Sequence, residues 1–238
     1  MTQEPALQEP YRRGMVVVAH ADDAEFSCSG TVAKWCKEGM EVAYVIVTDG
    51  SKGTDDRSIA PERLAEMRRQ EQISAGKVLG LKEVIFLGYP DAYLQPTLEV
   101  RRDITREIRR FRPDILITLN PTRTLSSSYY MGHPDHFAAG EAALSAVFPA
   151  ARDHLTFPEL LKEGLEPHKV REVLVVGHDH PDKWIDVSDS LHIAMQALLE
   201  HASQIGPEAV ERMKEWRTEA GKEKGLQYAE AFKSILLS

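Results

Sequence analysis

Short runs of apolar, largely β-branched residues alternate along this chain with longer stretches of helical spacing. The runs are Met15–Ala19, Val42–Val47, Val84–Leu87, Ile115–Leu119 and Val173–Val176. Each is too short for a buried helix and is flanked by glycine, proline or polar residues, which is typical of a fully buried strand. Strands that alternate with helices form a mainly parallel sheet with helices on both faces. We therefore expect an α/β three-layer sandwich.

Helices are predicted between these strands, where proline often starts and glycine often ends them. A sixth strand is expected at Trp184–Val187, and the expected helices are Phe26–Glu38, Pro61–Leu79, Leu98–Phe111, Pro134–Ala146, Ser190–Ala202 and much of the tail after Pro207. A chain of 238 residues fits one domain of this kind. We expect residues 1–238 to form it, with a short N-terminal extension at 1–13 and C-terminal helices at about 190–238.

The composition and net charge of the chain bear on its cellular compartment and on the partners that it can bind. The net charge of -8 argues against nucleic acid, which requires a concentrated basic face. Met1–Tyr11 has no apolar core of the signal-peptide kind, and no later run is long enough to span a membrane. Cys28 and Cys36 on one helix would lie roughly 12 Å apart, too far for a disulfide. Two unpaired thiols fit a reducing compartment, so we expect a cytoplasmic protein without a membrane partner.

A cluster of acids and a histidine follows the first predicted strand. His20, Asp22 and Asp23 occupy the turn where a dinucleotide-binding protein places its glycine-rich phosphate loop. Grouped carboxylates repel phosphate and attract a divalent cation. Taken alone, Asp22 and Asp23 are more often a solvated turn or a helix cap.

A second cluster follows the fourth predicted strand. Pro134 can start a helix there, so His133 and His136 project from the helix start toward the same edge of the sheet. If the first and fourth strands are neighbours, the two clusters meet at the edge where open α/β sheets bind ligands. Strand order is not visible in the sequence, so this remains conditional.

Two histidines and one carboxylate with an open position are typical of a catalytic zinc site, although Fe²⁺ or Co²⁺ suits the same ligands. The second acid of the Asp22–Asp23 pair is then free to accept a proton from metal-activated water and pass it to a leaving amine. A nearby protonated histidine can stabilise the oxyanion of an amide under attack.

These residues resemble the two signature motifs of the LmbE-like (PIG-L) zinc deacetylases. The resemblance covers roughly residues 14 to 200 and rests on His20–Asp23, His133–His136, Thr48–Gly50, Leu87–Asp91 and Arg112–Asp114. It implies the family's Rossmann-like fold with a mainly parallel sheet.

The resemblance also implies a role for each motif residue. His20, Asp23 and His136 would bind one Zn²⁺, and Asp22 would act as general base and later as general acid. His133 would help to stabilise the tetrahedral intermediate. Asp135 would orient His133 or support the charge of His133.

The implied activity is removal of an acetyl group from an N-acetylglucosamine-type conjugate, by a metal-dependent amidohydrolase that forms a trimer or hexamer. Two alternatives stay open. One is an amidase that acts on a larger amide or thiol conjugate, and the other is a sugar- or nucleotide-binding module without catalysis.

Two positions depart from the family pattern. Ala21 replaces the usual proline between histidine and aspartate, which leaves the turn less rigid but removes no ligand. Met131 stands where some members carry a tyrosine that assists the oxyanion. Either a neighbour such as Tyr129 or Tyr130 supplies the hydroxyl, or His133 does more of that work.

Substrate contacts are expected from Asp49, Arg63, Asp91 and Tyr130. Asp49 either supports the site or is an ordinary turn residue before a glycine, and Arg63 either binds sugar hydroxyls or lies on a solvated helix face. His178 and His180 are expected at a pocket edge or on the surface, in preference to a second metal site. His201 is assigned no role.

Overall fold

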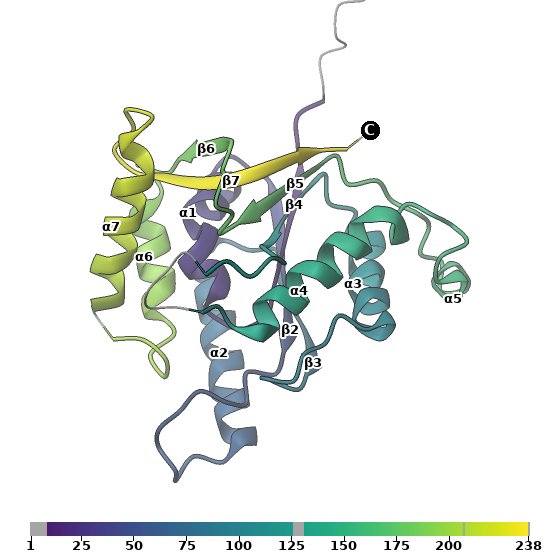
Figure 1. The fold of residues 1–238 in the computed structure, drawn as a ribbon, viewed down its shortest axis with the longest axis horizontal. Helices are drawn as coiled ribbons and strands as arrows, with labels where there is room; N and C mark the ends of the chain where they lie inside the picture. Colours follow the sequence, from purple (N-terminus) through teal and green to yellow (C-terminus); the bar gives the residue numbers. More distant parts are fainter. Residues whose placement is uncertain (1–8, 126–130, 207, 238) are drawn as a thin grey trace, which may run out of the picture.

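The computed structural model describes residues 9–125, 131–206 and 208–237. Its centre is a seven-stranded sheet with the order β3-β2-β1-β4-β5-β7-β6 (Figure 1). The strands are β1 (Arg13–Val18), β2 (Glu41–Thr48), β3 (Glu83–Tyr89), β4 (Ile115–Leu119), β5 (Glu172–Val176), β6 (Lys183–Asp186) and β7 (Ala229–Leu236). The expected α/β sandwich with a mainly parallel sheet is confirmed.

Strand β1 lies at the middle of the parallel part of the sheet, between β2 and β4. Val17 pairs with Val45 on one side and with Thr118 on the other, and both pairings are parallel. Apart from Arg13, every residue of β1 is buried. Such burial on both faces explains why these strands are continuous apolar runs without alternation.

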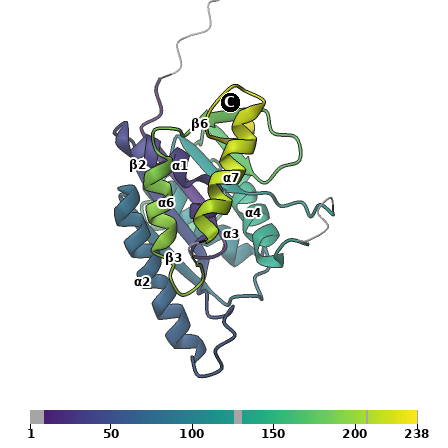
Figure 2. The same ribbon diagram turned by 90° about the vertical axis from the view of Figure 1, so that its left-hand side faces the viewer.

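Two layers of helices enclose the sheet. On one face lie α1 (Asp23–Lys37), α2 (Pro61–Leu79), α6 (Leu191–Leu199) and α7 (Glu208–Lys222), which Figure 2 shows toward the viewer. On the other face lie α3 (Leu98–Phe111) and α4 (Pro134–Ser145), which runs into the π-helical turn η1 (Ala146–Ala150). The short α5 (Pro158–Lys162) lies at the periphery (Figure 1).

The expectation of C-terminal helices at about 190–238 is wrong for the last part of this segment. After α7 the chain forms β7, which pairs antiparallel with both β5 and β6. Phe232 is fully buried there. A strand inserted between two others satisfies its backbone groups on both sides, and this tertiary pairing overrides the weak strand propensity of its alanine, glutamate and lysine.

Two further sequence expectations can be compared directly with the structure. Cys28 and Cys36 both lie on α1 and are free thiols, so the expectation that they do not pair is confirmed. Among the helices of the described residues, none combines the length and apolar character needed to cross a bilayer.

Candidate metal centre

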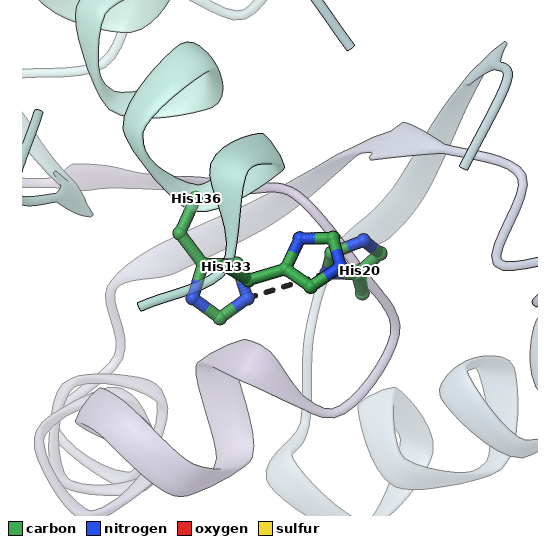
Figure 3. A group of neighbouring side chains, drawn as sticks. All are labelled: His20, His133 and His136. Carbon is green, nitrogen blue, oxygen red and sulfur yellow. Dashed lines mark hydrogen bonds between the residues drawn. The ribbon is translucent and has the colours of Figure 1, made fainter. Parts of the chain in front are cut away.

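The two predicted clusters meet at the carboxyl ends of neighbouring strands. Because β1 pairs with β4, the turn that follows β1 lies beside the residues that begin α4. The rings of His20, His133 and His136 converge there, His20 from the turn after β1 and the other two from the start of α4 (Figure 3). The condition set by the sequence, that the first and fourth strands are neighbours, is therefore met.

Three side chains direct ligand atoms at one point. His20 Nδ1 lies 3.3 Å from His136 Nε2 and 3.5 Å from Asp23 Oδ2. His136 Nε2 lies 3.0 Å from Asp23 Oδ1. Ligands of a tetrahedral zinc ion at about 2.0–2.1 Å lie roughly 3.3 Å from one another. Two imidazoles and a carboxylate at these separations fit a divalent ion of that kind.

His20 has a second ring nitrogen, which faces two other carboxylates. Its Nε2 lies 3.0 Å from Asp91 Oδ1 and 3.3 Å from Asp135 Oδ2. A metal-binding histidine usually donates its other N–H to a carboxylate, which fixes the tautomer and the ring orientation. Potential ligand atoms of His20, Asp91, His133 and Asp135 all lie within 4.8 Å of one another.

The electrostatics of the cluster favour a cation. Burial opposes charge on His20, but its hydrogen bonds to Asp135, Asp23 and Asp91 outweigh burial and raise the His20 pKa to about 12. Burial raises the pKa of Asp23, yet its contacts with His136 and His20 lower it overall. His20 is 6% exposed and Asp23 is 8% exposed, so these charges are little screened by solvent. The carboxylates that surround His20 thus stay ionised, and a metal ion bound between them can take the place of the proton on His20.

Asp22 sits beside this point in a strained turn. Its φ of 89° is left-handed, a conformation that costs a non-glycine residue about 1–3 kcal/mol and therefore requires support from its surroundings. Burial, and next the charge of Asp23, raise the pKa of Asp22 to about 7. A carboxyl group with that pKa can both accept and return a proton near neutrality.

Two residues of α2 support the turn, and the sequence reading missed them. Arg68 Nη2 donates to Ala21 O at 3.0 Å and lies 3.6 Å from Asp22 Oδ2. Gln72 Oε1 accepts the Asp22 backbone N–H at 3.2 Å. Both belong to the buried stripe of α2, in which Leu64, Ala75 and Leu79 are the apolar members. A polar residue within a helix's apolar stripe was the available signal.

His133 caps α4, and its Nδ1 accepts the Asp135 backbone N–H at 3.2 Å. Burial, and next the charge of His20, lower the His133 pKa. Asp135 is fully buried, and its carboxylate also accepts the backbone N–H groups of Ala92 at 2.7 Å and Leu94 at 3.2 Å. Besides its contact with His20, Asp135 thus holds the loop after β3, a role that the sequence did not suggest.

The residues that were expected to contact substrate do not all lie at the same cavity. Asp91 lines the cavity at the centre, whereas Asp49 Oδ1 accepts the backbone N–H groups of Ser51 at 2.9 Å and Asp91 at 3.2 Å. Arg63 is exposed on α2, and the arginine among the described residues that line the cavity is Arg68. Tyr130 lies outside the described residues.

The histidine pair after β5 forms a separate feature. The ring centroids of His178 and His180 lie 6.2 Å apart, and the His180 backbone N–H donates to His178 Nδ1 at 3.0 Å. Neither belongs to the groups of described residues whose ligand atoms could hold a metal. His180 is exposed and His178 is partly exposed, and the expectation of a pocket-edge or surface role for the pair stays a prediction.

Two cavities adjoin His136. The first, of about 290 Å³, holds the centre itself and is also lined by Lys52, Gly53 and Arg68. The second, of about 430 Å³, extends from His136 between α1, α4 and the ends of β4 and β5, with Phe26, Phe137 and Val176 in its wall. Both cavities have polar and apolar walls, and the second is also lined by Arg217 and Glu230.

Comparison with known proteins agrees with this geometry. The family profile described as GlcNAc-PI de-N-acetylase (PIG-L) matches residues 15–147. Diacetylchitobiose deacetylase of Thermococcus kodakarensis is 31% identical over 236 residues, which cover 96% of this chain and 86% of that protein. Mycothiol S-conjugate amidase of Streptomyces coelicolor is 29% identical, with 62% of this chain and 55% of that protein covered.

A solved structure extends the match to three dimensions. N,N'-diacetylchitobiose deacetylase from Pyrococcus horikoshii, complexed with its inhibitor MPG, superposes with a TM-score of 0.87 at 28% identity. The superposition covers 95% of this chain and 84% of that one. With more than half of the sequence matched by the family profile and nearly all of it by a relative, this chain belongs to the PIG-L (LmbE-like) deacetylase family.

Proposed function

We propose that this chain is a metal-dependent hydrolase that removes the acetyl group from an N-acetylated amino sugar. The observation that carries the proposal is the convergence of His20 Nδ1, His136 Nε2 and Asp23 within 3.5 Å, with Asp22 beside them. His20, Asp23 and His136 would hold one divalent ion. When bound, the ion would polarise an amide carbonyl and lower the pKa of a water molecule.

The remaining residues have roles that follow from their positions. Asp22 accepts a proton from the attacking water and delivers it to the amine nitrogen as the C–N bond breaks, so that water and amide become acetate and free amine. His133 faces the same cavity and donates a hydrogen bond to the carbonyl oxygen as negative charge develops there. Asp91 and Asp135 keep the His20 ring in place through its second nitrogen.

Zinc is the metal that we assign. Two imidazoles and one carboxylate with an open position are the ligand set of catalytic zinc sites, and the ligand separations suit tetrahedral coordination. Iron(II) and cobalt(II) accept the same donors. Metal analysis of protein purified without added metal, followed by reconstitution of the stripped chain with each ion, would identify the physiological metal.

The proposed substrate class follows from the relatives and from the cavity. The relative at 31% identity is a diacetylchitobiose deacetylase, which acts on an N-acetylated sugar. Here the cavity is also lined by Lys52, an exposed side chain that can bind sugar hydroxyls. Acetate release from a panel of N-acetylglucosamine conjugates tests the proposal. Bound metal together with release of free amine and acetate supports it, and bound metal without acetate release contradicts it.

A second candidate function is hydrolysis of a larger amide, and the cavity of about 430 Å³ next to His136 favours it. An amide with a bulky group beyond the reacting carbon could place that group against Phe26 and Phe137. Mass analysis of the acid released separates the candidates, because one predicts acetate and the other a larger acid. A chain that holds no metal and gains no activity with added zinc would instead indicate a binding module.

The cytoplasmic location and the trimer or hexamer expected from the sequence remain proposals. Light scattering of the purified chain would measure its oligomeric state directly.

A further inference from the structure

A buried polar network connects the C-terminal part of the chain to the turn that carries Asp22. It begins at His201, the second residue after α6, and continues through Glu25 of α1 and Gln72 of α2. All three side chains are fully buried. Solvent does not reach polar groups so placed, so their orientations depend on their neighbours within the network.

Each link of the network fixes the next. His201 Nε2 lies 3.2 Å from Glu25 Oε2, and the other oxygen, Glu25 Oε1, accepts from Gln72 Nε2 at 3.0 Å. Because the Gln72 amide donates to Glu25, its Oε1 faces the opposite way and accepts the Asp22 backbone N–H at 3.2 Å. His201 is thus linked to the amide that supports Asp22 by an ion pair with Glu25 and by the hydrogen bond from Gln72 to Glu25.

The residues after His201 fasten the same segment to α2 and to the rim of the cavity. The backbone N–H and the hydroxyl of Ser203 both donate to the Glu71 carboxylate at 2.7 Å. Gln204 Oε1 would lie 3.5 Å from a Cβ placed on Gly53, a residue that lines the metal cavity. Segment 201–204 therefore contacts α2 and lies near Gly53 in the loop that follows β2.

The Asp22 turn needs such support, because its left-handed φ of 89° is unfavourable for a residue with a side chain. Its carboxylate faces the buried Asp23 carboxylate, which repels it, and Arg68 is the nearest cation to it at 3.6 Å. A turn under strain and repulsion holds one geometry only when the surrounding structure fixes it.

We infer that His201 is a positioning residue. It orders the Asp22 turn through Glu25 and Gln72 and so fixes the position of the Asp22 carboxylate relative to the reacting amide. This inference rests on the proposed function, in which Asp22 carries the proton. His201 is not among the described residues that line the cavity. Loss of His201 should therefore lower kcat and leave KM and metal content nearly unchanged.

The test compares His201→Ala and His201→Gln with His192→Ala, which alters an exposed histidine of α6. A displaced catalytic group can cost about 10²-fold in rate, so we expect that order of loss in kcat for His201→Ala. Glutamine keeps an N–H donor toward Glu25 and should recover much of the rate. His192→Ala should match the unaltered chain. Metal content and thermal unfolding of each variant show whether it is folded and loaded.

A double-mutant cycle covers the case in which His201→Ala does not fold. Gln72→Met keeps the length of the side chain but removes the amide, and combining it with His201→Leu, which fills much of the space but offers no N–H, tests whether the two residues act through one path. Losses that fail to add support the network, and losses that add overturn it. Unchanged kcat in folded, metal-loaded His201 variants would also overturn it. An unaltered, metal-loaded chain that cleaves no amide would instead refute the proposed function, and this inference with it.

Discussion

Two buried charged clusters contact α1, and they differ in how their charges are satisfied. Near the middle of the helix, Glu230 accepts from the backbone N–H groups of Gly30 at 3.0 Å and Thr31 at 2.8 Å and from Arg217 Nε at 2.9 Å. Arg217 in turn donates to Phe26 O at 2.7 Å. Every charge in this cluster is matched by a partner, so the cluster needs nothing from outside.

At the start of the same helix, the charged side chains converge on one point and do not form separate ion pairs. His20, Asp23 and His136 bring their ligand atoms to within 3.5 Å of one another, and Asp22 adds a further carboxylate beside them. Metal ligands must be deprotonated to bind, so such a cluster is completed by a cation. Burial of charge alone therefore does not indicate a site, whereas convergent ligand atoms that are not matched in pairs do.

The largest expected effect is loss of the metal. His136→Ala removes one of three ligands and should leave the purified chain with little bound metal. Because a catalytic metal supplies several kcal/mol of stabilisation to the transition state, turnover should fall by roughly 10³-fold or more. Treatment of the unaltered chain with a chelator should do the same, reversibly. If a metal-free chain keeps its turnover, the cluster of His20, Asp23 and His136 does not need a cation, and it does not differ from the Arg217–Glu230 cluster in that respect.

The next effect concerns proton transfer without loss of metal. Asp22→Asn keeps the size of the side chain but cannot accept the proton, so kcat should fall by about 10²–10⁴-fold. Metal content should stay at the level of the unaltered chain. Parallel metal analysis and steady-state kinetics check both points, and turnover near the normal value would show that Asp22 is not the base.

Disruption of the Arg217–Glu230 cluster should lower the stability of the fold. Glu230→Ala leaves Arg217 buried without its carboxylate and should lower the free energy of unfolding by about 3–5 kcal/mol. The control is Glu219→Ala, which breaks an exposed ion pair with Lys222 and should cost at most about 1 kcal/mol. Urea unfolding followed by tryptophan fluorescence measures both. Equal, small losses would mean that the Arg217–Glu230 pair adds nothing beyond a surface pair.

The smallest effect should be seen at the thiols of α1. Burial, and then the charges of Glu230 and Glu25, raise the pKa of Cys28 well above its usual value, whereas burial alone raises that of Cys36 to about 11. Only the thiolate reacts, so at pH 8 Cys36 should be alkylated roughly 10²-fold more slowly than a free cysteine of pKa 8.5. As pH rises toward 11, Cys36 should react first. Mass spectrometry after iodoacetamide treatment records the order, and faster alkylation of Cys28 would contradict it.

Much of the fold and the centre was predictable because the relevant signals are local. A buried parallel strand is visible as a short apolar run, and the residues directly after it lie at the ligand-binding edge whatever the strand order. His20, Asp23, His133 and His136 were found for this reason. Strand β7 was missed because its pairing with β5 and β6, and not its composition, makes it a strand.

Spacing within a few residues was enough to predict the α/β class, the family motifs and the residues with the chemistry to hold a metal. The adjacency of β1 and β4, which brings His20 to His136, 116 positions away, is a property of the folded sheet alone. The same is true of the contacts of Arg68 and Gln72 with the Asp22 turn. Such contacts join helices remote in the chain, and their geometry exists only once the sheet has brought those helices together.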